Sequence, residues 1–146
     1  MSDEPRVAIL LAGVGQVGRV LLDEAMRLFG PQPGLHALQF DVPVDDVAAR
    51  ERLAREVARV DAGRGVVVLT DLCGSTLANL CFELARQRPD VDVVCGVSLA
   101  MLTKIWSLDR RRVSPQTLAR QMADTGRRGV SVASERFAGD REKDRA

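Results

Sequence analysis

The residues best suited to chemistry form a glycine-rich loop near the start of the chain. Gly13, Gly15 and Gly18 make the pattern GxGxxG directly after the apolar run VAILLA, and Asp41 follows the next apolar segment. Glycines at this spacing let a pyrophosphate approach a helix N-terminus, and an acid about 20 residues further on can bind ribose hydroxyls. The pattern therefore predicts a dinucleotide site. The alternative is that the glycines serve only a tight strand-to-helix turn and close helix packing.

A second candidate site lies in the polar segment 70–79, TDLCGSTLAN, which follows the apolar run GVVVL. Gly74, Ser75 and Thr76 lead into an expected helix, and the free N–H groups at a helix N-terminus favour an anion. N-capping of the helix accounts for the Ser-Thr pair equally well.

Cysteine and histidine are scarce. Cys73, Cys81 and Cys95 are not spaced as metal ligands, and the last two lie in apolar segments, so we expect both to be reduced core residues. Cys73 stands near a helix start, where a thiol can be activated to carry phosphate, but no recognisable base accompanies it. His36 is the single histidine, so a histidine-based zinc site is very hard to build. We expect no metal and no cofactor.

Composition excludes several classes of function. The 146 residues include 21 basic and 20 acidic side chains, which nearly cancel, and aromatic residues make up 3%. Neither a basic surface nor base-stacking platforms for nucleic acid are expected. No apolar run reaches the roughly 20 residues that span a bilayer. The polar start MSDEPR does not resemble a secretory signal, so we expect a cytoplasmic protein.

Strand and helix patterns alternate along the chain. Short, fully apolar runs are typical of strands buried on both faces of a parallel sheet. We expect strands at 7–12, 35–42, 65–70, 91–97 and 129–133, and helices at 16–29, 47–60, 77–88, 99–106 and 115–125. The prediction is an α/β fold, a single doubly wound, mostly parallel sheet with helices on both faces. It occupies residues 1–134, and the charged tail 135–146 is expected to be flexible and unfolded.

Ligands in such sheets bind at the carboxyl ends of the strands. The loops that matter are therefore 13–18, 71–79 and 96–101. The first two contain the candidate sites described above.

Two motifs resemble those of mannose-family EIIA domains of the phosphoenolpyruvate-dependent sugar phosphotransferase system (PTS). The segment 70–79 looks like the family loop "LxDxxGGSPxN", and 96–102, GVSLAML, is similar to "GVNLPML". The expected helix at 115–125 and the short final strand also fall where the family has them. The resemblance covers residues 6–134 and is more specific than a lone GxGxxG.

The resemblance implies a phosphate-accepting histidine at the end of the first strand, where it relays phosphate from HPr to EIIB. Val14 stands at that position. Phosphoryl transfer needs a nucleophile with a lone pair, and valine has none. We therefore expect a regulatory or binding protein that does not carry phosphate, with HPr, EIIB or another regulatory protein as partner. His36 is expected at the opposite end of the sheet and is a poor replacement.

The resemblance also implies roles for other residues. Asp71 matches the family aspartate that orients the histidine; without that partner, it organises the loop or binds another donor. A vestigial anion pocket is implied at Gly15, Gly74, Ser75, Thr76 and Asn79. The family forms homodimers with an exchanged C-terminal strand, so the 129–133 segment suggests the same here. The dinucleotide hypothesis is weakened because no second domain is expected to supply catalytic residues.

Overall fold

Four parallel strands form the centre of the molecule, in the order β2-β1-β3-β4. The computed structural model describes residues 4–145. The strands are β1 (Ala8–Val14), β2 (Leu35–Phe40), β3 (Val66–Thr70) and β4 (Val91–Cys95). All residues of β3 are buried and only Val14 of β1 is partly exposed, as expected for central strands covered on both faces.

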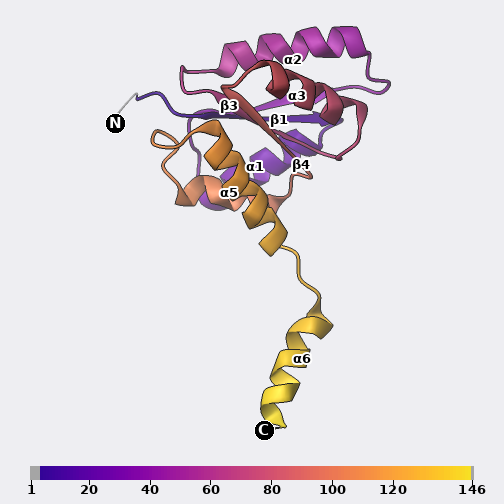
Figure 1. Ribbon diagram of the computed structural model, residues 1–146, viewed down its shortest axis with the longest axis vertical. Coiled ribbons are helices and arrows are strands. Elements are labelled where there is room, and N and C mark those ends of the chain that lie inside the picture. The colour runs from indigo at the N-terminus through magenta and orange to yellow at the C-terminus, as the bar shows by residue number, and fades with distance from the viewer. Residues whose placement is uncertain (1–3, 146) are drawn as a thin grey trace.

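Helices cover both faces of this sheet (Figure 1). One face packs against α2 (Asp46–Val60) and α3 (Thr76–Gln87), whose buried residues meet Leu10 and Val68 of the sheet. The other face packs against α1 (Val17–Phe29), α4 (Leu99–Leu102), the 3-10 helix η1 (Thr103–Ser107) and α5 (Pro115–Arg128). The predicted α/β sheet with helices on both faces is confirmed.

Side-chain caps set several helix starts. Asp45 caps α2, with one carboxylate oxygen accepting from Val47 N and Ala48 N at 3.0 and 3.1 Å. Ser75, Ser98 and Ser114 cap α3, α4 and α5 in the same way. These serines and Asp45 have extended backbone conformations, and their side chains accept hydrogen bonds from free N–H groups in the first turn of the helix.

A buried arginine closes the amino-terminal end of the sheet. The guanidinium of Arg110 donates to Val7 O at 2.8 Å, Gln32 Oε1 at 3.2 Å, Gly34 O at 3.4 Å and Pro33 O. Only 3% of Arg110 is exposed, and this burial lowers its pKa to about 10. Backbone carbonyls therefore satisfy the buried cation, and the chain segments they belong to are held together.

Gly65 directly precedes β3 at the same end of the sheet, where neighbouring backbone segments approach closely. Its φ is +86°, and a Cβ there would overlap the carbonyl oxygen of Asp90 and approach Pro115 Cγ to 2.6 Å. Only glycine combines this backbone conformation with so close an approach of two neighbouring segments.

The C-terminal segment differs from the prediction. Helix α5 continues to Arg128, and Gly129 ends it by donating to the carbonyl oxygens of Thr125 and Gly126. The expected strand at 129–133 does not form: within residues 4–145 the sheet has four strands, and this segment is not one of them.

The tail after this segment was expected to be unfolded, but the described residues form a helix from Ala133 to Asp144. Helix α6 (Ala133–Asp144) is exposed along its length and projects away from the body (Figure 1). Its composition of alanine, glutamate, arginine and lysine favours helix, although no buried face supports it.

Candidate functional site

The candidate site lies at the topological switch point of the sheet. Strand β1 has β2 on one side and β3 on the other, so the loops that leave β1 and β3 diverge. Ala12 of β1 pairs with Thr70 of β3, which brings Val14 and Asp71 to the same edge. Open α/β sheets bind their ligands in the crevice that forms at this point.

Asp71 links the two loops through backbone hydrogen bonds. Its Oδ2 accepts from Val14 N at 3.0 Å, and its Oδ1 accepts from Leu72 N at 2.7 Å. Its carbonyl oxygen accepts from Gly96 N at 2.7 Å. Asp71 therefore organises all three loops at this edge, while the Val14 side chain packs against the core beneath α2 and α3. The side chain of Val14, the last residue of β1, supplies no lone pair for a nucleophilic reaction.

The glycine-rich loop has the geometry of a tight turn. Gly15 has a φ of +70°, and its N–H donates to Phe40 O at 2.8 Å. A Cβ at Gly18 would lie 3.3 Å from Leu11 Cβ, so this glycine allows α1 to pack closely on β1. Gly13 is buried beside Gly18, while Asp41 is exposed beyond the end of β2. Because the Gly15 N–H already has an acceptor, that donor is lost to the predicted anion pocket.

The remaining residues of the predicted anion pocket gather at the start of α3. Gly74 has a φ of +84°, and Ser75 is the N-cap, its Oγ accepting from Ala78 N at 3.1 Å. Thr76 and Asn79 are exposed in the first turn. The structure thus brings four of the five residues together and gives Ser75 the capping role that was the alternative.

His36 lies far from this edge. It pairs with Leu10 of β1, whereas Val14 pairs with Phe40, four residues further along β2. At about 3.3 Å per residue this separates His36 from Val14 by about 13 Å. Burial and then the nearby Arg59 lower the pKa of His36.

The cysteines correct the sequence-based prediction. Cys73 and Cys95 form a disulfide with their Cα atoms 5.2 Å apart, so Cys95 is not a reduced core residue. Cys81 is buried and free as predicted, and burial, with a smaller contribution from Asp71, raises its pKa to about 12. In the disulfide, Cys73 has no thiolate to accept phosphate. The signal that sequence reasoning missed is that the loop after β3 and the end of β4 meet at one edge.

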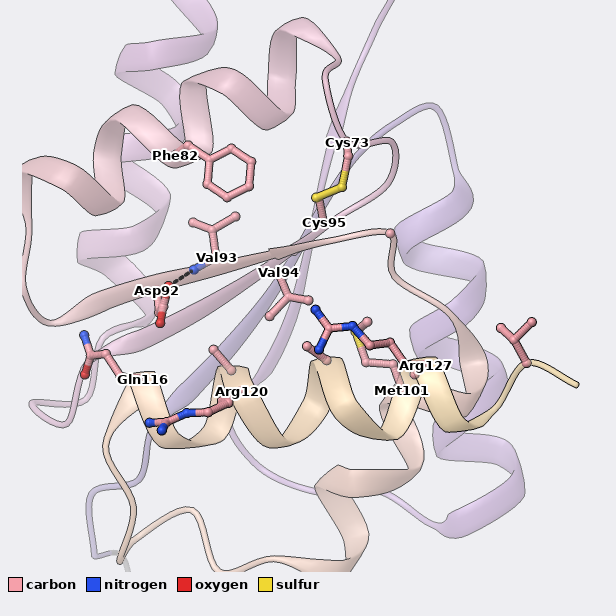
Figure 2. Close-up of a pocket in the computed structure, with 15 residues that line it drawn as sticks. Cys73, Phe82, Asp92, Val93, Val94, Cys95, Met101, Gln116, Arg120 and Arg127 are labelled. Carbon is pink, nitrogen blue, oxygen red and sulfur yellow. Dashed lines mark hydrogen bonds between the residues drawn. A yellow bond between two sulfur atoms is a disulfide. The ribbon is translucent and has the colours of Figure 1, made fainter.

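A groove of about 650 Å³ runs beside β4, and the Cys73–Cys95 disulfide lies at one end of it (Figure 2). Phe82 of α3 lies on one side of it and Arg120 and Arg127 of α5 on the other. Strand β4 pairs only with β3, so within the described residues its outer edge has no strand partner. Val130, just after α5, also lines the groove.

Exposed apolar side chains surround the candidate site. Val17 is the first residue of α1, Val42 and Val47 follow β2, and Leu72 follows Asp71; they are 50, 78, 65 and 73% exposed. Exposed apolar side chains that form a patch are typical of a surface that binds another protein.

Comparison with known proteins agrees with this arrangement. Residues 8–121 match the family described as "PTS system fructose IIA component". The chain is 26% identical over 127 residues to the PTS system mannose-specific EIIAB component of Escherichia coli K12, which covers 86% of this chain. The chain spans only 39% of the length of that relative.

Solved structures show the same fold. The phosphotransferase system component EIIA from Streptococcus agalactiae superimposes with a TM-score of 0.76 at 23% identity, over 88% of this chain and 98% of that one. The mannose/sorbose-specific IIA subunit from Enterococcus faecalis gives a TM-score of 0.76 at 20% identity, over 87% and 94%. Within residues 4–145 no helix has the length and apolar character to span a membrane. The comparisons do not favour the dinucleotide hypothesis, and the chain belongs to the mannose/fructose family of PTS EIIA components.

Proposed function

We propose that this protein is an EIIA domain that binds PTS or regulatory partners without carrying phosphate. The observation that supports the proposal is Val14, which ends β1 where the family resemblance expects the phosphate-accepting histidine. Transfer of a phosphoryl group from phosphohistidine needs an acceptor with an available lone pair.

The polar neighbours of Val14 do not replace that acceptor. Both carboxylate oxygens of Asp71 accept hydrogen bonds from backbone N–H groups, and Ser75 Oγ caps α3. The hydroxyl of Thr76 is exposed, but a hydroxyl needs an adjacent base to become a nucleophile. The single imidazole of the chain, that of His36, is about 13 Å away along the sheet.

The surface around Val14 supports a binding role. Val17, Val42, Val47 and Leu72 offer apolar contact area at the edge where a phosphocarrier would have to approach. We expect such a surface to keep affinity for a partner when the reacting atom is lost, because a few well-packed anchor side chains supply most of the binding energy of an interface. We propose HPr, EIIB or another regulatory protein as the partner.

We also propose that the protein is a homodimer in which β4 receives a segment of the second copy. The unpaired edge of β4 and the groove beside it support this, since exposed strand edges are readily extended by another chain. The segment 129–132 of the second copy, which contains Val130 and Val132, is the occupant that the family resemblance suggests. Light scattering on the purified protein tests this, and a monomer at high concentration would contradict it.

The test of the main proposal is a phosphoryl relay from phosphoenolpyruvate through enzyme I and HPr. We expect no label on the wild-type chain and an acid-labile label on Val14→His, because the new imidazole would lie beside Asp71. Val14→Ala is the matched control and should stay unlabelled. Calorimetry with unphosphorylated HPr and EIIB measures binding separately. Label on the wild-type chain, lost in His36→Gln, would contradict the proposal.

A further inference from the structure

The disulfide between Cys73 and Cys95 joins the loop of the candidate site to the edge of the sheet. Cys73 lies in the turn between β3 and α3, and Cys95 is the last residue of β4. Figure 2 shows the bond at one end of the groove, above the strand. Two residues before Cys73 stands Asp71, which holds Val14 N and Leu72 N.

The bond is not needed to hold α3 and β4 together. Leu77 and Leu80 of α3 share one buried core with Val91 and Val93 of β4, and β4 is fully paired with β3. What the bond adds is a restraint on the exposed turn. Among the hydrogen bonds of residues 4–145, none comes from or goes to the backbone of Cys73 or Gly74.

The bond is also open to attack. Cys73 is exposed and Cys95 half-buried, and both sulfur-bearing residues line the groove. Disulfides that reagents can reach are the ones that exchange readily with external thiols. The third cysteine, Cys81, is fully buried, so it neither competes for the pair nor meets external reagents.

We propose that Cys73 and Cys95 form a reversible redox couple that fixes the loop carrying Asp71 when oxidised and releases it when reduced. In reduction, the thiolate of a low-molecular-weight thiol such as glutathione attacks the Cys73 sulfur and displaces Cys95 as a thiolate. A second thiol attacks the mixed disulfide and displaces Cys73. Two thiols become one disulfide, and their two electrons and two protons pass to the protein dithiol. Oxidised glutathione drives the reverse exchange.

The release weakens the contact between the two loops of the site. With the bond intact, the turn is anchored at Cys73 and Asp71 faces Val14 N. Without it, the turn between Asp71 and Ser75 gains backbone freedom, and the hydrogen bonds from Val14 N and Leu72 N open more often. The couple therefore controls the order of the surface that partners would meet. This inference goes beyond the proposed function and does not depend on any PTS partner.

The first test measures the thiol state of the full chain. The protein is equilibrated in buffers of reduced and oxidised glutathione. Its free thiols are then alkylated with N-ethylmaleimide under denaturing conditions, and intact-protein mass spectrometry counts the adducts. We expect one adduct, on Cys81, at the oxidising end and three at the reducing end, with the same curve from both directions. Cys81→Ala should lose one adduct and keep the transition. The inference would be overturned if Cys73 and Cys95 never form a disulfide, or if glutathione never reduces that disulfide in the native protein.

The second test measures amide hydrogen exchange in the oxidised and reduced wild-type protein. We expect exchange at Val14 and Leu72 to accelerate by about tenfold or more on reduction, since both N–H groups depend on Asp71. Val7 N, bonded to Arg110 O at 2.9 Å at the other end of the sheet, should not change. Cys73→Ser should match the reduced protein. Equal exchange at Val14 and Leu72 in both states would show that the bond does not control the loop.

Discussion

The two ends of the sheet are built differently. At the amino-terminal end, the buried Arg110 side chain donates to backbone carbonyls, and Gly65 lies so close to Asp90 O that a Cβ would overlap it. At the carboxyl end, Val14 is partly exposed at the end of β1, and Leu72 in the loop after β3 is 73% exposed. From this difference we expect that substitutions at the amino-terminal end cost more stability than substitutions at the carboxyl end.

Replacing Gly65 by alanine should have the largest effect on stability. A Cβ would overlap Asp90 O, and the positive φ would strain any other residue, so we expect a loss of about 4 kcal/mol in the free energy of unfolding. Gly74→Ala at the other end also has a positive φ, but nothing lies within 4 Å of its Cβ. There the expected loss is about 1 kcal/mol. Urea denaturation measures the loss in each variant, and equal losses would contradict the proposed difference between the two ends of the sheet.

Arg110→Met should cost the next largest amount. The change leaves the carbonyls of Val7, Pro33 and Gly34 without their donor, and buried acceptors that lose a charged partner cost about 3 kcal/mol together. Arg112→Met is the control, because its side chain is 81% exposed in its ion pair with Asp109. We expect less than about 0.5 kcal/mol there by thermal or urea denaturation.

Asp71→Asn should have a smaller effect on stability and a local effect on structure. An asparagine offers one acceptor oxygen in place of two, so one of Val14 N and Leu72 N loses its partner. We expect a loss of about 1 kcal/mol, with NMR shifts confined to the three loops at the carboxyl edge. Asp41 is an exposed residue at the same edge, so Asp41→Asn should change neither the free energy of unfolding nor the NMR shifts of these loops. Shifts that reach the amino-terminal end would contradict the separation of the two ends.

His36 should produce the smallest effect, seen in the pH dependence of stability. Burial first, and then Arg59, lower its pKa below the ordinary value of 6.5. The unfolded chain therefore binds the proton more readily, and stability falls as the pH drops from 6.5 through the lower folded value. The single histidine gives one imidazole signal, so an NMR titration reads its pKa directly. His36→Gln should remove this part of the pH dependence, and a raised pKa would contradict it.

Much of the fold was predictable from local patterns. The apolar runs of β1 and β3 indicated central parallel strands, and Asp45 and Pro115 marked helix starts within one residue. Features that depend on distant segments were not predictable. Arg110 is buried because it meets Val7 O, 103 residues away in sequence, and no local pattern shows that a charged residue will find carbonyl partners.

The candidate site was predictable in part for the same reason. The motif around Asp71 placed it at the carboxyl edge, and the structure adds that its carboxylate binds Val14 N. The Cys73–Cys95 bond escaped prediction because it depends on which strands are neighbours. The expected strand at 129–133 was wrong, because a short apolar run forms a strand only when it pairs with a neighbouring strand, and no local pattern shows whether that pairing occurs.

The most direct test of the central claim is the transfer of phosphate from phosphorylated HPr to the wild-type chain, followed by intact-protein mass spectrometry. We expect no mass gain on the wild-type chain under conditions in which Val14→His gains one phosphoryl group. A phosphoryl group on the wild-type chain, at any residue, would contradict the proposal that a chain with valine at position 14 does not carry phosphate.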